Sequence, residues 1–371
     1  MFDYSEQVEA FRDERVRLPK EFREKLFDHR DSNRDRLVFR LPKRIPGLTI
    51  SYDSFKPQGS SAVKTIIQTK FVYEEYDIDD GLVLCRHELV NDEGKELTAD
   101  EVRDHVLEAL KDKRFVKQPN MASNAIRVYY KEDDEEKHHI DFPIYRKFIN
   151  AKGDVVRELA SATGWVESDP TQVNKWFNEQ VESRNENIAG KGTQMRRLIQ
   201  LIKRFCRSRY AWDMPNGMKL TMLVAECQPA FHNRLDLAFR RLLEELKARL
   251  EEDKVIRNLA HPDQPALTRT DSDQNVVGFL EKIEEALQKL SVLDSPDHQD
   301  TKSAREQWDW VFQSDGFLRE YDAKKEKREK QARLERLAST IESGTARTSP
   351  FGVIGSVGVV NPPHLFYGCI I

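Results

Sequence analysis

GSSAVKTIIQTKFVYEEYDIDDG, residues 59–81, is the segment from which the fold and the chemistry of this chain can be predicted. It opens with a Gly-Ser turn, whose free backbone N–H groups and hydroxyl suit a phosphate. It ends in Asp77 and Asp79, which leave the same face if this end is a strand, because side chains alternate along a strand. Two neighbouring carboxylates repel each other unless a cation lies between them, and Mg²⁺ binds one or two carboxylates together with substrate phosphates. The segment therefore predicts a phosphate cradle beside half of a metal site.

The composition is that of a globular protein with a charged surface. The chain has 371 residues, enough for one large or two ordinary domains, of which 39% are hydrophobic and 33% charged. A net charge of −4 provides no basic field for duplex DNA or an anionic membrane. No apolar run reaches the roughly 18–20 residues that cross a bilayer. We therefore expect no membrane and no long nucleic acid among its partners.

The cysteines and the N-terminus predict a cytoplasmic protein with reduced thiols. Cys85, Cys206, Cys227 and Cys369 have no C-x-x-C spacing, so they indicate neither a disulfide framework nor a zinc site. Residues 1–20 are charged throughout and lack the apolar centre of a signal peptide.

The first 150 residues or so predict a small mixed α/β domain. The segment 82–90 is the expected antiparallel partner of the strand that ends the opening segment, with a hairpin turn at Asp80 and Gly81. The other expected elements are a helix at 4–29 with a break at Pro19, a helix at 98–111 with a capping box at Thr98 and Glu101, strands at 126–131 and 139–145, and a charged turn at 132–137.

Beyond residue 150 the pattern becomes helical. The expected helices begin at Asp169-Pro170, with Asp as N-cap, and cover 193–210, 219–254, 276–293 and a highly charged stretch at 321–338. The last residues, 344–371, are rich in Gly, Ser and Pro and predict a flexible tail.

Asp141 is the candidate for a third metal-binding carboxylate. It lies alone in an apolar strand, where an unpaired carboxylate is costly and needs a cation or a hydrogen-bond partner. If Asp77, Asp79 and Asp141 converge, they could hold two Mg²⁺ ions, with Mn²⁺ as an alternative, about 3.5–4 Å apart. One ion would bind a triphosphate and the other would lower the pKa of an attacking hydroxyl.

The order of these parts is similar to that of the polymerase-β-like nucleotidyltransferase superfamily. Four local strings carry a closer resemblance: DIDDG (77–81), HIDFPIY (139–145), WVESDPTQVNKWFNE (165–179) and PNGMKLTMLVAE (215–226). They resemble the bacterial cGAS/DncV-like nucleotidyltransferases (CD-NTases), most of all the vibrio-type cyclic GMP–AMP synthases. The last string is similar to a helix start in the family's OAS-like helical domain. The resemblance covers roughly residues 1–290.

The resemblance implies an α+β fold in three parts. A polymerase-β-like nucleotidyltransferase core with the N-terminal helix would occupy 1–155, an OAS-like all-helical domain 156–340 and a flexible tail 341–371, with a central cleft between the two lobes. The family joins nucleoside triphosphates into a cyclic di- or trinucleotide and releases pyrophosphate. That product activates an effector in anti-phage (CBASS) defence. The resemblance thus implies ATP, with GTP or a second ATP, as substrates; we expect a monomer.

The resemblance also implies roles for individual residues. Gly59 and Ser60 would hold the donor triphosphate, and Asp77, Asp79 and Asp141 would bind the metal ions. These five residues carry the core of the predicted site.

Three basic residues extend the predicted nucleotide site. Lys203 matches a helical lysine of the family that reaches the triphosphate, and its helix face is shared by Arg196, Gln200 and Arg207. Arg127 matches a family arginine on the strand before Asp141. Lys219 ends the string NGMK (216–219), at a place where relatives often have a Ser-rich string. Which group in this string contacts phosphate or base is therefore an open question.

Other interpretations of these residues exist. DIDDG alone would be a hairpin turn, and it half-resembles an EF-hand, but Leu82 stands where that loop needs glycine. His138 and His139 are interpreted as surface or hydrogen-bonded histidines, not ligands. Tyr145 and Tyr52 are both candidates for an aromatic ring that stacks on a base.

Two other functions are kept as alternatives. The first is a transferase that adds nucleotides to RNA ends or to protein, and the second is a non-enzymatic, metal-binding scaffold. The tail has its own hypothesis, conjugation by a ubiquitin-like apparatus, as in some systems of the family. A prenylation box does not fit, because Cys369 is third from the end.

Overall fold

The computed structural model describes residues 1–71, 74–130, 138–169, 171–183, 187–188, 192–355 and 357–360. The chain forms two compact units, Met1–Gln313 and Ser314–Ile371. The predicted charged turn at 132–137, Pro170 and Cys369 lie outside the described residues.

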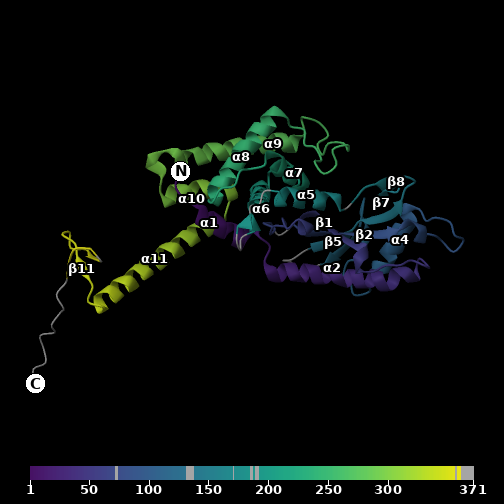
Figure 1. The fold of residues 1–371 in the computed structure, drawn as a ribbon, viewed down its shortest axis with the longest axis horizontal. Helices are drawn as coiled ribbons and strands as arrows, with labels where there is room; N and C mark the ends of the chain where they lie inside the picture. Colours follow the sequence, from purple (N-terminus) through teal and green to yellow (C-terminus); the bar gives the residue numbers. More distant parts are fainter. Residues whose placement is uncertain are drawn as a thin grey trace, which may run out of the picture. The chain divides into compact units, whose positions relative to one another are not determined.

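The described strands of the first unit build one mixed sheet of eight strands, besides a separate short pair (Figure 1). The sheet strands are β1 Phe55–Gln58, β2 Tyr76–Cys85, β3 Asn120–Met121, β4 Ile126–Tyr130, β5 His138–Phe142, β6 Ile144–Ile149, β7 Val155–Ser161 and β8 Gly164–Glu167. Their order is β3-β4-β5-β2-β6-β7-β8, with β1 paired to β2. The separate pair is β9 Asn187–Ile188 and β10 Gly192–Thr193.

The strand β2 runs straight through Asp80 and Gly81, so the predicted hairpin is wrong. The antiparallel partner of β2 is β1, which precedes it in the chain, and Gly81 lies opposite Lys56 in that ladder. A Cβ at Gly81 would displace the amide of Gln58 and lie 3.2 Å from the carbonyl oxygen of Lys56, so there is little room for a side chain at this point of the strand. The predicted partner segment 82–90 instead completes β2 and continues into a 3-10 helix, Arg86–Glu88.

The strands β5 and β6 are two halves of one run that lies parallel to β2 in a single register. They are separated at Pro143, which cannot donate a ladder hydrogen bond, while its carbonyl accepts one from Leu82 N at 2.8 Å. The strand predicted at 139–145 is therefore interrupted. The register places Asp79 opposite Asp141 and Asp77 opposite His139.

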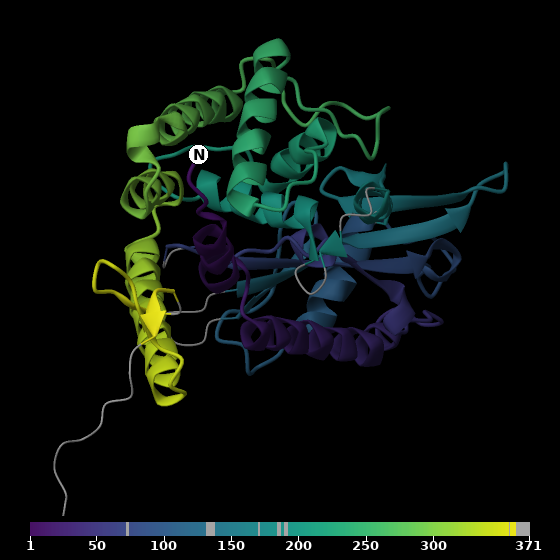
Figure 2. The ribbon, with the colours of Figure 1, turned by 60° about the vertical axis from the view of Figure 1, so that its left-hand side comes forward.

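Two helices, α2 Lys20–Arg40 and α4 Ala99–Leu110, pack against each other and against the sheet (Figure 2). The break before α2 at Pro19 and the capping box of Thr98 and Glu101 are both confirmed. The helix α2 continues to Arg40, well past its predicted end at residue 29, because Leu26 and Leu37 are both buried in the core against the sheet.

The remaining helices of the first unit include the central helix α6, which packs against α7, α8 and α10. They are α1 Ser5–Phe11, α5 Gln172–Glu182, α6 Gln194–Cys206, α7 Gly217–Cys227, α8 Leu235–Glu252, α9 Gln274–Ser291 and α10 Thr301–Phe312. Every residue of α6 except Arg196 is buried. The helix predicted at 219–254 is divided into α7 and α8, and α1 packs on α8 through a hydrogen bond from Tyr4 N to Asp236. The predicted boundary between residues 155 and 156 stays a prediction.

Shorter turns complete the first unit: a π-helix Arg12–Val16, α3 Gly59–Ala62, and 3-10 helices Leu41–Lys43, Tyr52–Ser54, Val292–Asp294 and Pro296–His298. None of the helices in the described ranges is long and apolar enough to cross a bilayer.

The second unit consists of α11 Phe317–Glu342 and three short strands, β11 Arg347–Thr348, β12 Ile354–Gly355 and β13 Val359–Val360. The charged helix predicted at 321–338 lies inside α11, so it is confirmed. Part of the predicted tail thus forms a small sheet, and residues 361–371 lie outside the described part of the chain.

We expect the ion pair of Arg34 and Asp80 to be the electrostatic anchor of α2 on the sheet. Asp80 is fully buried and accepts two hydrogen bonds of 2.6 Å from the Arg34 guanidinium. Asp80→Ala should therefore lower the free energy of unfolding by about 3–5 kcal/mol, since it leaves a buried charge unpaired. Urea unfolding measures this, with Arg114→Ala, a well-exposed arginine, as the control. A loss below about 1 kcal/mol, within the range of surface substitutions, would contradict the assignment.

Candidate active site

The structure brings the three predicted carboxylates together. Asp77 and Asp79 lie on β2, and the parallel register places Asp141 of β5 directly beside Asp79. Asp77 is half exposed, whereas Asp141 is buried. Three acidic side chains on two neighbouring strands therefore form one cluster.

The cluster is electrostatically unfavourable without a cation. Burial, followed by the charges of Asp77 and Asp141, raises the pKa of Asp79 to about 7. A divalent cation among these oxygens would stabilise the ionised form of Asp79 and offset the repulsion. The residues present therefore fit a metal site of the kind that the sequence predicts.

Arg127 on β4 neutralises part of this charge. It lies opposite Asp141 in the antiparallel ladder and donates to both carboxylate oxygens, with Nε at 2.8 Å and Nη2 at 2.6 Å. These hydrogen bonds raise the pKa of Arg127 above its usual value. Arg127 therefore orients Asp141.

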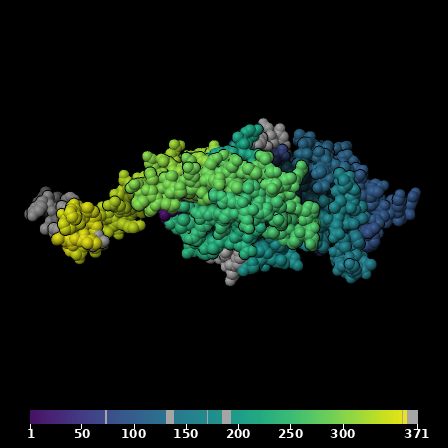
Figure 3. All heavy atoms as spheres, turned by 90° about the horizontal axis from the view of Figure 1, so that it is seen from above, coloured from purple at the N-terminus to yellow at the C-terminus, as the bar shows by residue number. Residues whose placement is uncertain are grey.

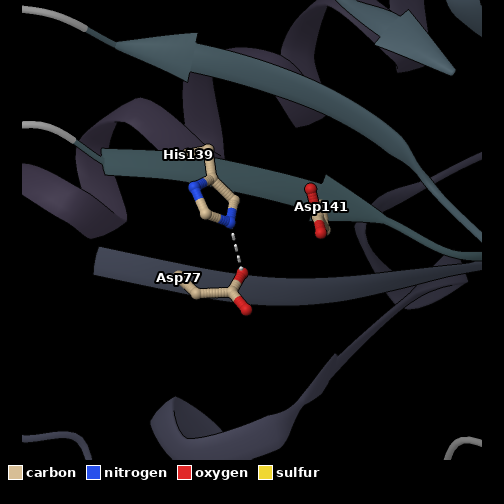
Figure 4. Close-up of side chains that lie close together, drawn as sticks. All are labelled: Asp77, His139 and Asp141. Atoms are coloured by element: carbon tan, nitrogen blue, oxygen red, sulfur yellow. Dashed lines mark ion pairs between the residues drawn. The ribbon is translucent and has the colours of Figure 1, made fainter. Parts of the chain in front are cut away.

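His139 is the member of the cluster that the sequence interpretation missed. It is buried, its Nδ1 lies 3.0 Å from Glu75, and its Nε2 lies 3.2 Å from Asp77 (Figure 4). Burial alone would lower the pKa of His139, but the carboxylate of Asp77 outweighs burial and raises it. The spacing His-x-Asp was the available signal, because residues two apart on a strand share a face.

The Gly59 turn packs directly on the carboxylate of Asp79. It begins α3 immediately after β1, where Gln58 lies opposite Asp79. Gly59 has a positive φ of 63°, and a Cβ at this position would collide with Asp79 Oδ2. Glycine is therefore required here both by the backbone conformation and by the close approach.

The polar side of α6 holds the backbone that follows this turn. Arg196, Gln200 and Lys203 donate in turn to the carbonyls of residues 63–65, at 3.1, 3.3 and 3.2 Å. Lys203 also donates to the hydroxyl of Thr65 at 2.9 Å. Three successive turns of one helix thus position the segment next to Gly59 and Ser60.

Lys203 is a buried cation with an unusual acidity. Burial, and then the charge of Arg207, lower its pKa to about 7. An anionic ligand close to its ammonium group would stabilise the charged form, as expected for a residue that meets a phosphate.

A cleft of about 540 Å³ joins these parts. Of the predicted site residues, Gly59, Ser60, Asp77, Asp79 and Lys203 line it, with Asn216, Asn258 and His261 among the lining residues of the helical part. In the space-filling view a furrow separates the green helical part from the blue sheet part (Figure 3).

The other predicted residues lie outside the lining of this cleft. Asp141 lies opposite Asp79 in the sheet, and Arg127 lies opposite Asp141. The ammonium of Lys219 is paired with Asp273 at 2.8 Å. Of the two candidate stacking rings, Tyr145 lines the cleft, whereas Tyr52 is exposed elsewhere and donates its hydroxyl to Asp35.

Comparison with known proteins agrees with this geometry. Residues 53–145 match the family model of the nucleotidyltransferase domain of cyclic GMP-AMP synthase DncV-like proteins. The crystal structure of Vibrio cholerae DncV cyclic AMP-GMP synthase, a prokaryotic cGAS homolog, has a TM-score of 0.65 and 16% sequence identity, covering 84% of this chain and 96% of that chain. The structure of the same enzyme in complex with the linear intermediate 5′ pppA(3′,5′)pG has a TM-score of 0.64 and 17% sequence identity, with the same coverage of both chains. The structure of the CD-NTase CdnG of Bradyrhizobium diazoefficiens in complex with GTP has a TM-score of 0.61 and 17% sequence identity, covering 86% of this chain and 99% of that chain.

The fold, the matched domain and the carboxylate cluster define a nucleotidyltransferase. Within that class, residues 53–145 match the DncV-like nucleotidyltransferase domain, and the fold is that of the bacterial cGAS/DncV-like nucleotidyltransferases that the sequence motifs resemble. The predicted α+β architecture of a mixed sheet and a helical domain is confirmed with it.

We expect Gly59→Ala to separate activity from stability. The new methyl group must displace Asp79, and a displacement of about 1 Å at a reacting centre can lower the rate about 100-fold. The matched control is Gly47→Ala, which has a positive φ of 82° but open space around its Cβ. Both variants should lose about 1 kcal/mol of unfolding free energy from the strained φ. Equal nucleotidyl transfer by the two variants would contradict the close approach.

We expect nucleotide affinity to depend on the charge of Lys203. A lysine with a pKa of about 7 loses its charge as the pH rises through 7, so binding of a non-hydrolysable triphosphate should weaken about 10-fold between pH 6.5 and 8.5. Calorimetry on wild type, Lys203→Met and the exposed-lysine control Lys175→Met measures this. The pH dependence of the affinity should persist in Lys175→Met and be reduced in Lys203→Met. An unchanged pH dependence in Lys203→Met would show that another group causes it.

Proposed function

We propose that this protein joins nucleoside triphosphates into a cyclic dinucleotide or trinucleotide, with release of pyrophosphate, in a metal-dependent reaction. The observation that carries the proposal is the register of β2 and β5, which places Asp77, Asp79 and Asp141 together beside the Gly59 turn. Similarity to a DncV structure with a linear dinucleotide intermediate and to CdnG with GTP supports the same reaction class. ATP, with GTP or a second ATP, is the proposed substrate set.

Asp77, Asp79 and Asp141 would hold two Mg²⁺ ions, or Mn²⁺. When bound, such ions stabilise charge on a transferring phosphoryl group and lower the pKa of an attacking hydroxyl. The raised pKa of Asp79 supports the assignment, since a cation removes the penalty that burial and the neighbouring carboxylates impose.

The remaining residues bind and orient the donor nucleotide. Gly59, Ser60 and Lys203 line one cleft, where their backbone N–H groups and the lysine ammonium would bind the triphosphate. The hydrogen bonds from α6 keep the adjacent segment in place, and Arg127 keeps Asp141 in its orientation. Tyr145 would stack on a base, because it is the candidate ring that lines the cleft.

The cleft has the volume expected for a nucleotide site. At about 540 Å³ it lies within the range of roughly 300–1,000 Å³ that is common for small-molecule sites. It is bordered by the helical part as well as the sheet, so residues from both can select the bases.

The cellular role is proposed from the family. A cyclic nucleotide made by this protein would act as a second messenger in anti-phage (CBASS) signalling, in the cytoplasm. Conjugation of residues 341–371 by a ubiquitin-like apparatus is a separate proposal. Mass spectrometry of the protein from its native host tests it, and an unmodified C-terminus during infection would contradict it.

The reaction is tested with purified protein, divalent metal and all pairs of nucleoside triphosphates. Wild type should release pyrophosphate and form a phosphatase-resistant product whose mass identifies the bases. Asp77→Asn, Asp79→Asn and Asp141→Asn should each lower the rate about 1,000-fold or more without unfolding the protein, because each removes a charged metal ligand. Asp92→Asn, an exposed carboxylate, is the matched control and should retain activity.

The outcomes also separate the alternatives. A linear product, or nucleotides attached to RNA or protein, would replace the proposal by a related transferase. Absence of any product from wild type, with and without an extract of the native host, would leave the non-enzymatic scaffold as the function.

A further inference from the structure

We propose that His139 is a nitrogen ligand in the metal site, so that the position next to Asp77 and Asp141 selects Mn²⁺ over Mg²⁺. The inference rests on the proposed metal-dependent function and adds to it the identity of the ion and of a fourth ligand residue. It starts from a side chain that the carboxylate pattern in the sequence does not include.

Asp77, His139 and Asp141 each present one donor atom to the same small volume. Their donor atoms all lie within 4.8 Å of one another. Figure 4 shows the His139 ring next to the Asp77 carboxylate with Asp141 to one side, His139 and Asp141 coming from one strand and Asp77 from the neighbouring one. This is a compact set of one imidazole and two carboxylates.

The Nε2 atom of His139 is the unusual member of this set. The residue is 93% buried, and Nε2 has no solvent exposure; it lies 3.2 Å from Asp77 Oδ1, close enough for an ion pair but without the geometry of a hydrogen bond. A buried polar atom without a hydrogen bond is costly and requires an explanation. A cation between Nε2 and the carboxylates provides one.

The other ring nitrogen is already oriented for this role. Nδ1 lies 3.0 Å from a carboxylate oxygen of Glu75 and donates its hydrogen to it. That arrangement leaves Nε2, which faces Asp77, as the ring nitrogen that would bind a metal ion in its deprotonated form. Histidines that bind metals characteristically donate their second N–H to a carboxylate, which fixes the ring and strengthens the ligand.

The donor set determines which ion is preferred. Mg²⁺ strongly prefers an octahedron of oxygen atoms, whereas Mn²⁺, a transition-metal ion that also suits carboxylates, accepts an imidazole nitrogen more readily than Mg²⁺ does. Asp79 packs against the Gly59 turn, on the oxygen-only side of the cluster. If two ions bind, as proposed, their positions would be chemically different, and the one beside His139 would favour Mn²⁺.

The neighbouring histidine shows that this placement is specific. His138 precedes His139 in β5 and faces the opposite side of the sheet, where it stacks on Tyr130 with ring centroids 4.9 Å apart and on His29 at 5.0 Å. One histidine of the pair thus belongs to the core and the other to the metal site.

The test is spin-echo spectroscopy of the full-length protein loaded with Mn²⁺ alone. Wild type should show ¹⁴N modulation from a directly bound imidazole, which ¹⁵N-labelled histidine should convert to ¹⁵N coupling. His139→Gln should lose the modulation, and its affinity for Mn²⁺ should fall about 10-fold or more, the size of effect seen when metal-site residues are replaced. Its affinity for Mg²⁺, measured by competition, should change less than about 3-fold, since oxygen ligands dominate that ion.

His87→Gln is the matched control, because the His87 side chain is 82% exposed and lies outside the cluster. It should keep both the nitrogen signal and the affinity. Absence of ¹⁴N modulation in wild type, or its survival in His139→Gln, would overturn the inference, and the wild-type measurement decides the question even if the variant does not fold. Because no turnover is needed, nitrogen coupling without cyclic product would overturn the proposed function alone, whereas product without coupling would overturn this inference alone.

Discussion

The convergence of acidic side chains on β2 and β5 is the constraint that the surrounding structure accommodates. Three carboxylates on two neighbouring strands repel each other, and burial makes the charged form of Asp79 still less favourable. The Gly59 turn packs on Asp79 and carries no charge that could compensate it. Arg127 donates two hydrogen bonds to Asp141, and His139 lies 3.2 Å from Asp77. These contacts reduce the repulsion only in part, which leaves a site that favours cations.

The aspartates of the motif DIDDG lie on one strand, β2, but on its two opposite faces. Asp77 and Asp79 face the cleft because they are two residues apart, while Asp80 points to the other side of β2 and pairs with Arg34 of α2. The third acidic residue of the motif is therefore a structural one. This alternation explains how three nearly adjacent aspartates have different roles and different surroundings.

The helix α6 connects the two parts of the first unit. Its apolar residues are buried in the helical part, and its polar side donates hydrogen bonds to residues 63–65, which follow the Gly59 turn. Lys203 therefore has two functions in one position, because it holds Thr65 and also lines the cleft. A shift of α6 would move the turn and the lysine together.

Local patterns were sufficient for the capped helix at Thr98, the break at Pro19, the family motifs and the three carboxylates, because capping, ring constraints and strand alternation depend on neighbours in the chain. They were insufficient for the path of β2, where Asp-Gly favours a turn locally but pairing with β1 and the ion pair to Arg34 keep the strand extended. The contact of His139 with Asp77 and the hydrogen bond of Lys203 to Thr65 join residues 62 and 138 positions apart, which meet only when the sheet and helices pack. The same packing buries Lys203 and lowers its pKa. Sequence thus specified which groups are present, and folding specified their charge, burial and partners.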